Sequence, residues 1–129
     1  MEACYHLTLA GGAKFNIDTI ERQLSTDPAI FRHPSSGTLT YIVCTDERSV
    51  PHLKGRMLAD PHEPYDTLGV IILRPEYLTV YQSVPDEIMN RIAKFIIPLI
   101  RDLNCNIVNE FGDDITDRYR GQLEKLFGK

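Results

Sequence analysis

The chain has 129 residues, enough for one domain and too few for two ordinary ones. Hydrophobic residues make up 43% and charged residues 25%, which is typical of a folded globular protein and excludes a disordered chain. The 14 Lys and Arg against 18 Asp and Glu give a net charge of −4. This argues against nucleic acid or an anionic membrane as the main partner, because both bind basic surfaces.

The N-terminal segment and the cysteines point to a cytoplasmic protein. Residues 1–6 have neither the basic nor the apolar region of a secretory signal. The longest apolar runs, at 69–73 and 95–100, are far shorter than the roughly 20 residues of a membrane span. Three cysteines without CxxC spacing indicate neither a disulfide framework nor a zinc site, and they lie in apolar runs at Cys4, Cys44 and Cys105. We therefore expect a reducing compartment.

The first third of the chain predicts three strands and one helix. The strands are expected at 4–10, 29–32 and 38–44, and the helix over 17–24. In the first strand Leu7 and its alternate neighbours are apolar on one face, while His6 belongs to the other face, so this strand is half-buried. Asn16 is positioned to cap the helix.

Residues 45–67 have a different character, since they contain three prolines and a glycine. A weak helical pattern begins at Pro51, a residue that suits the first turn of a helix. We expect a short helix followed by a long loop. Loops of this length in compact domains usually either serve a function or move.

The second half predicts a hairpin, a long helix, a strand and a final helix. The hairpin is expected from strands at 68–74 and 77–83, the long helix at 85–103 and the strand at 104–109. The final helix is expected to begin at Asp113 or Asp114 and to have the core positions Ile115, Tyr119, Leu123 and Leu126. Residues 69–73 are apolar on both faces, which favours a central strand covered on both sides. Pro98 should kink the long helix or cut it short, because proline lacks the N–H that the helix needs.

The long helix is predicted to have one apolar and one charged face. Its apolar stripe comprises Ile88, Ile92, Phe95 or Ile96, Leu99 and Leu103, and its charged face Glu87, Arg91, Lys94 and Arg101. The whole order is β-α-β-β-(loop)-β-β-α-β-α, with too few helices for a doubly wound parallel sheet. We predict a single α+β domain over 1–129, with a mixed or mainly antiparallel sheet of five to six strands and two to three packed helices.

One short motif suggests catalysis. His6-Leu7-Thr8 is an HxT sequence, in which an imidazole and a hydroxyl share one face of a strand. Phosphodiesterases with this motif use two copies, because paired histidines act as acid and base. The other candidate here, His33-Pro34-Ser35, is interrupted by proline. A histidine without a catalytic role is therefore the favoured interpretation of His6, and a phosphoester hydrolase is the alternative.

Residues 52–63 contain four side chains that metals accept as ligands, namely His52, Asp60, His62 and Glu63. Their spacing does not match HExxH or another metal motif, and soluble loops often carry such residues. We predict no metal and no cofactor. A buried strand thiol is likewise the favoured interpretation of Cys44, although a cysteine nucleophile would need only a neighbouring base.

The acidic character of the last third is the feature with most weight. Residues 102–117 contain five acids and no Lys or Arg: Asp102, Glu110, Asp113, Asp114 and Asp117. Acids at the start of the final helix suit its dipole, which is the structural explanation. The functional explanation is that these acids form one negative patch with the loop residues Asp60, Glu63, Tyr65 and Asp66, in which the tyrosine is an aromatic anchor.

The chain is small, acidic and α+β, and it lacks catalytic motifs. In this general character it resembles bacterial immunity proteins, which neutralise a toxin by occluding its active site. The resemblance implies a partner with a basic surface, such as a toxin, and no catalysis. We therefore expect a non-enzymatic protein-binding module of the immunity type, which binds through the acidic residues of 110–117 and the loop residues of 60–66. The alternatives are the hydrolase using His6 and a small-ligand sensor that binds under the long loop.

Overall fold

The structure is a computed structural model that describes residues 3–34, 39–60, 69–82, 86–117 and 121. Its strands are β1 (Ala3–Thr8), β2 (Ile30–Arg32), β3 (Leu39–Val43), β4 (Gly69–Leu73), β5 (Leu78–Gln82) and β6 (Asn106–Asn109). Its helices are α1 (Ile17–Leu24), α2 (Val50–Ala59) and α3 (Asp86–Leu103), with short 3₁₀ helices η1 (Ala10–Gly12) and η2 (Glu47–Ser49).

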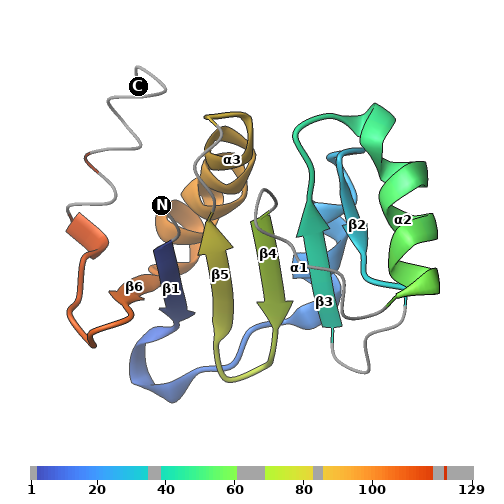
Figure 1. The fold of residues 1–129 in the computed structure, drawn as a ribbon. Helices are drawn as coiled ribbons and strands as arrows, with labels where there is room; N and C mark the ends of the chain where they lie inside the picture. Colours follow the sequence, from blue (N-terminus) through green and yellow to red (C-terminus); the bar gives the residue numbers. More distant parts are fainter. Residues whose placement is uncertain (1–2, 35–38, 61–68, 83–85, 118–120, 122–129) are drawn as a thin grey trace.

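The strands form one six-stranded sheet in the order β2-β3-β4-β5-β1-β6 (Figure 1). Every neighbouring pair is antiparallel. The predicted α+β class is therefore confirmed, with a fully antiparallel sheet. Among the described residues β2 and β6 are the two edge strands, so segments that contact them lie at opposite ends of the sheet.

The alternation predicted for β1 divides the whole sheet into two faces. Leu7 belongs to the main core together with Ile92 of α3 and Ile20 of α1. We call this side the α3 face. On the opposite side Ile42 of β3 and Met57 of α2 belong to a second buried cluster. We call that side the α2 face.

The central position predicted for β4 is confirmed. Ile71 is buried in the main core, while Val70 is buried in the cluster beneath α2. A strand with apolar residues on both faces needs cover on both sides, because each exposed methylene group forgoes about 0.8 kcal/mol of burial. The helix predicted near Pro51 is also present, since α2 has this proline in its first turn.

Local capping fixes where α1 begins. The Asn16 side chain accepts a hydrogen bond from the Thr19 N–H at 3.2 Å, as predicted for the helix N-terminus. The helix then buries Ile20 and Leu24 against the sheet. The opposite face of α1 is polar and faces solvent, so the helix packs with its apolar side alone, on the α3 face of the sheet.

The predicted extent of α3 to residue 103 is confirmed, so Pro98 does not cut the helix short, whereas the apolar-stripe position predicted for Leu103 is wrong. The helix continues past Pro98 to Leu103, because the turns around the proline bury Phe95, Leu99 and their neighbours. The proline costs about 3 kcal/mol through the lost hydrogen bond and the steric clash, which is less than the free energy gained by burying these side chains. Leu103 itself is 45% exposed, since the chain turns away at the next residue.

Arg91, predicted on the charged face of α3, makes contacts that the sequence did not predict. It donates to the Asp27 carboxylate at 2.6 Å and to the Thr45 carbonyl at 3.3 Å. The guanidinium thereby connects α3 to the segment before β2 and to the end of β3. Amphipathic spacing could not reveal this contact, because it depends on which loops approach the helix.

The end of the chain is described only in part. The expected final helix begins with helical backbone at Thr116 and Asp117. Three of its four predicted core positions, Tyr119, Leu123 and Leu126, lie outside the described residues. Ile115, the first of them, is buried in the main core.

Candidate functional site

The segment after β6 folds back along the outer edge of this strand. The Ile115 N–H donates to the Ile107 carbonyl at 2.8 Å, and the Ile107 N–H donates to the Thr116 hydroxyl at 2.8 Å. Val108 also forms a bridge with Asp114. These bonds occupy backbone groups that an edge strand would otherwise present to another chain. They also hold the acidic segment against the sheet.

Between β6 and this returning segment lies a turn centred on Asn109. Its side-chain oxygen accepts hydrogen bonds from the N–H groups of Phe111 at 2.9 Å and Asp113 at 3.0 Å. Its backbone N–H donates to the Asp113 carbonyl, and its carbonyl accepts from Gly112. Gly112 has φ +85°, a conformation that side chains disfavour. We call residues 109–114 the acidic turn.

The acidic turn presents three carboxylates to solvent, those of Glu110, Asp113 and Asp114. None of the three forms an ion pair within the described part of the chain. Asp117, which follows the turn, is exposed as well. Three of the five acids of residues 102–117 thus lie together on one turn, and their charge is not cancelled by described arginines or lysines.

Asp114 combines this exposure with a structural role. Its carboxylate accepts hydrogen bonds from the Thr116 hydroxyl at 2.6 Å and the Thr116 N–H at 2.9 Å. These bonds favour the charged form, so they lower the pKa of Asp114 below its ordinary value of 3.8. The carboxylate is therefore ionised at neutral pH.

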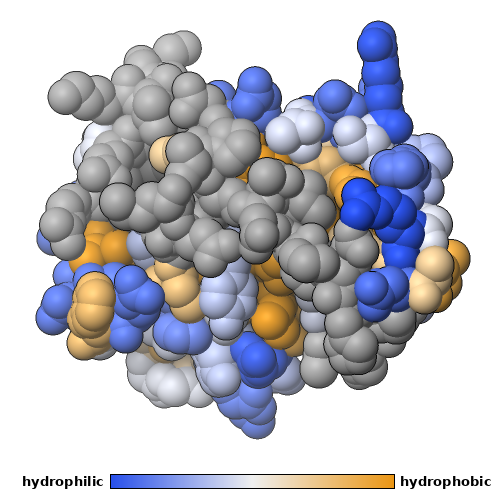
Figure 2. Space-filling model, in the orientation of Figure 1, coloured by the Kyte–Doolittle hydropathy of each residue, from blue (hydrophilic) through white to orange (hydrophobic). Residues whose placement is uncertain are grey.

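An aromatic residue that the sequence analysis missed lies at the tip of the acidic turn. Phe111 is 80% exposed, the most exposed of the large hydrophobic residues described. In Figure 2 a light-orange surface bordered by blue lies at the lower left, where Figure 1 shows the turn after β6. The signal in the sequence was an aromatic residue between Glu110 and Gly112, inside a segment already expected to turn.

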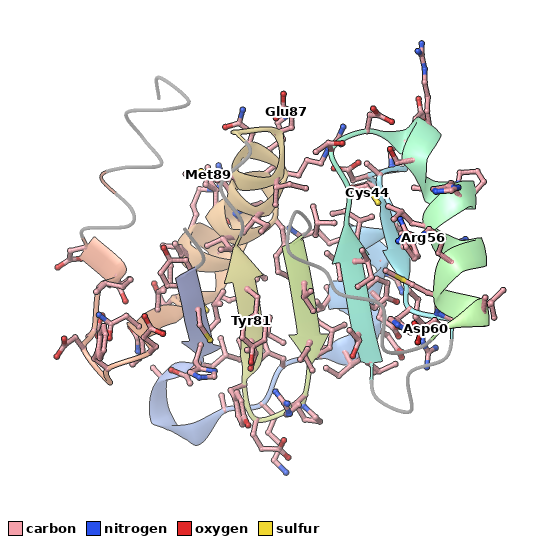
Figure 3. The ribbon with its side chains drawn as sticks, viewed as in Figure 1. Cys44, Arg56, Asp60, Tyr81, Glu87 and Met89 are labelled. Atoms are coloured by element: carbon pink, nitrogen blue, oxygen red, sulfur yellow. The ribbon has the colours of Figure 1, made fainter. Side chains whose placement is uncertain are left out.

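The second half of the predicted patch does not join the acidic turn. Asp60 follows the end of α2, at the β2 side of the sheet, whereas the turn follows β6 at the other edge (Figure 3). Glu63, Tyr65 and Asp66 lie outside the described residues. The described carboxylates therefore do not form one continuous patch.

His6 lies in a polar group on the α2 face of β1 and β5. It is directly opposite Thr79 in the antiparallel register, and its Nδ1 lies 3.1 Å from the Thr79 hydroxyl. Arg74 donates to the same hydroxyl at 3.0 Å. The ring of Tyr77 contacts His6 edge to face at 5.5 Å, and the Arg74 guanidinium lies 4.7 Å over that ring. We call these four residues the His6 cluster.

No second histidine joins the His6 cluster among the described residues. His33 follows β2 at the far edge of the sheet, and His52 lies on α2. The paired-histidine arrangement that motivated the hydrolase hypothesis is therefore not formed by the described chain. Sequence reasoning also missed Arg74 and Thr79, because only the register of β1 with β5 brings them to His6.

The cysteines provide no activated nucleophile in the described structure. Burial raises the pKa of Cys44 to about 11 and that of Cys105 to about 12. Cys4 is half-buried and hydrogen-bonds with Tyr81, and burial again raises the pKa of its thiol. Within the described ranges no three His, Cys, Asp or Glu side chains are placed to hold a metal ion. Nor is any described helix long and apolar enough to span a membrane.

Comparison with protein-family models, curated proteins and solved structures finds no significant match to this chain. The fold defines the class, an α+β protein with a six-stranded antiparallel sheet and helices on both faces. Any functional conclusion must therefore come from the side chains themselves.

Proposed function

We propose that the protein is a non-enzymatic binding module whose acidic turn docks on a basic protein surface. The observation that supports this most is the position of Phe111, 80% exposed at the tip of a hydrogen-bonded turn and flanked by carboxylates. Aromatic side chains that fill a pocket are frequent energetic centres of protein interfaces, and a polar rim around them is typical. A preorganised turn also loses little conformational entropy on binding.

The charge of the turn specifies the kind of partner. Carboxylates without described counter-ions attract a basic surface and accelerate its approach, while their rim position contributes less to the lifetime of the complex. An inhibitor of the immunity type, which occludes a basic toxin, is the particular form that we propose for this binding. In that form the turn would cover the basic groups that contact the toxin's own substrate.

Association kinetics test the proposal. The whole protein, immobilised by one terminus, is used to isolate a basic partner, and rates are then measured across a series of NaCl concentrations. We expect the double variant Asp113→Asn and Asp114→Asn to associate several-fold more slowly at low salt, with the difference vanishing at high salt. Phe111→Ala should instead increase the dissociation rate by about tenfold or more, because it removes the buried anchor.

A matched control separates a local effect from a change in net charge. Asp18→Asn with Glu47→Gln removes the same two charges from α1 and η2, where both residues are exposed. We expect this control to associate almost as fast as the parent. If the control slows association as much as the variant in the turn, the acidic turn is not the binding site.

The other two hypotheses remain predictions. A phosphoester hydrolase would need a partner for His6 beyond the described His6 cluster. A ligand sensor that binds under the long loop depends on residues 61–68, which are outside the described residues. The described residues provide no observation of a second acid or base for the hydrolase, nor of a ligand site under the long loop.

A further inference from the structure

Arg74 is a half-buried cation without a described counter-ion. Among the residues that the structure describes, no carboxylate lies within ion-pair distance of its guanidinium. Its fixed contacts are instead the Thr79 hydroxyl and the face of Tyr77. A guanidinium has five N–H donors, and this hydroxyl takes one of them. In a protein with an excess of acids, an arginine held away from every described carboxylate is a candidate for binding an external anion.

The position of Arg74 is determined by rigid neighbours. Thr79 is 3% exposed and is the second residue of β5, paired with His6 of β1, so its hydroxyl is a fixed acceptor. Tyr77 contacts both groups, with its ring under the guanidinium and nearly perpendicular to the His6 ring. The arginine follows β4 and the threonine lies in β5, so the β4–β5 hairpin sets their separation. Less side-chain entropy would therefore be lost on binding than for a free surface arginine.

His6 supplies a second donor at the same place. Because Arg74 donates to the Thr79 oxygen, the hydroxyl hydrogen is available to the Nδ1 atom of His6. A neutral imidazole whose Nδ1 accepts a hydrogen bond carries its hydrogen on Nε2. His6 is half-buried on the same face of the sheet. In that tautomer the His6 cluster combines a guanidinium fork with a ring N–H, and both residues contact the same Thr79 hydroxyl.

We propose that the His6 cluster binds the phosphoryl group of a small ligand, with Arg74 and His6 as the contacting residues and Thr79 and Tyr77 as positioning residues. A guanidinium donates through two parallel N–H groups to adjacent oxygens of a phosphate, which a single ammonium cannot do. The imidazole N–H provides a third hydrogen bond to another oxygen. The proposal is independent of the acidic turn, since the two sites use different residues and opposite charge.

The binding test uses the full chain, with inorganic phosphate as the first probe and phenyl phosphate as the second. Ionic strength is held constant with NaCl, and the signals of the His6 ring are followed by NMR together with calorimetry. We expect saturable shifts of the His6 signals. Arg74→Gln should weaken binding by about tenfold or more, the loss of a charge-assisted hydrogen bond. Tighter binding of phenyl phosphate than of phosphate would identify an organic monoester as the ligand class, and equal binding the free ion.

Control variants make the result specific to this geometry. Arg22→Gln removes an exposed arginine from α1 on the opposite side of the sheet and should leave the affinity unchanged. Arg74→Lys keeps the charge without the fork, so it should recover only part of the affinity. His6→Gln, a second disruptive variant in case Arg74→Gln does not fold, should weaken binding as well.

Two results would overturn the proposal. One is the absence of saturable His6 shifts in the parent protein up to tens of millimolar phosphate, on the scale of the weakest specific affinities. The other is an equal loss of affinity in Arg74→Gln and Arg22→Gln, which would mean that phosphate responds only to net charge. Neither result bears on the acidic turn, so the two proposals fail independently.

Discussion

At the scale of single residues, Gly69 shows how closely α3 approaches the sheet. A Cβ built on this glycine would lie 2.9 Å from Ile88 Cγ2, 2.9 Å from Ile92 Cδ1 and 3.1 Å from Val43 Cβ. Ile88 and Val43 are β-branched and fully buried, so their atoms cannot rotate away without moving the helix or β3. We predict that Gly69→Ala lowers the free energy of unfolding by about 1–3 kcal/mol, measured by urea denaturation.

The same substitution elsewhere in the chain provides the control. Gly55 lies within α2, and a Cβ there would meet no atom within 4 Å. Alanine has less conformational freedom than glycine in the unfolded chain and a higher helix propensity, so Gly55→Ala should raise the free energy of unfolding by about 0.5–1 kcal/mol. The explanation by close approach is contradicted if the two alanine variants shift stability in the same direction.

Sequence rules correctly predicted the roles of residues whose contacts are local, and they missed residues whose contacts depend on the pairing of distant strands. The cap at Asn16 and the two faces of β1 depend on neighbours in the sequence, so the pattern alone was enough to identify them. Arg74 and Thr79 reach His6 only because β1 pairs with β5, two strands that are some 70 residues apart in the chain. No spacing rule within one segment contains that information.

At the scale of elements, Thr116 joins the returning segment to β6. Its hydroxyl accepts from the Ile107 N–H and donates to Asp114, so one side chain serves the strand edge and the acidic turn together. Ile107 is fully buried. Thr116→Val keeps the shape of the side chain and leaves this N–H without its acceptor. We predict a loss of about 1–3 kcal/mol in the free energy of unfolding, measured in urea.

The same variant should change the acid titration of the turn. The hydrogen bonds from Thr116 lower the pKa of Asp114, so they stabilise the fold above pH 3.8 and this contribution is lost as the pH falls through the lower, folded-state pKa. In Thr116→Val the pKa of Asp114, followed by NMR, should rise toward 3.8. Thr19→Val on the exposed face of α1 is the control, and equal effects of both variants on stability would contradict the role assigned to Thr116.

Elements were predicted best where one strong pattern decided them. The apolar stripe of α3 predicted the helix as far as residue 103 although a proline lies inside it, and the structure confirms that extent. For residues 45–67 the pattern was weak, and the ten-residue length of α2 depends on contacts that Met57 makes with the second cluster. Tertiary burial, rather than helix propensity, stabilises such a helix.

At the scale of the whole molecule, the order of the strands determines which charged segments can act together. The sequence suggested one patch built from the acidic turn and the loop that begins at Asp60. Because β6 and β2 occupy opposite edges, the described ends of these two segments lie far apart (Figure 1). Strand order is a property of the complete sheet, and no segment of the sequence encodes it alone. The binding proposal accordingly rests on the acidic turn.

The stability of the whole fold should also depend on pH through one buried histidine. His33 follows β2 and its backbone N–H donates to the Thr40 carbonyl at 2.8 Å. The residue is only 5% exposed. Burial disfavours the charged imidazole, so it lowers the pKa of His33 below the ordinary value of 6.5.

The lowered pKa of His33 makes the folded state less stable as the pH falls. Between pH 6.5 and the lower pKa of the folded state, the unfolded chain protonates His33 more than the folded chain does, so protons stabilise the unfolded state. We predict that the free energy of unfolding falls as the pH is lowered from 7.5 to 5.5, measured by urea denaturation at several pH values. His33→Gln, which cannot titrate, should flatten this slope, whereas His52→Gln on exposed α2 should keep the slope of the parent. A parent slope that persists unchanged in His33→Gln would assign the pH dependence to another group.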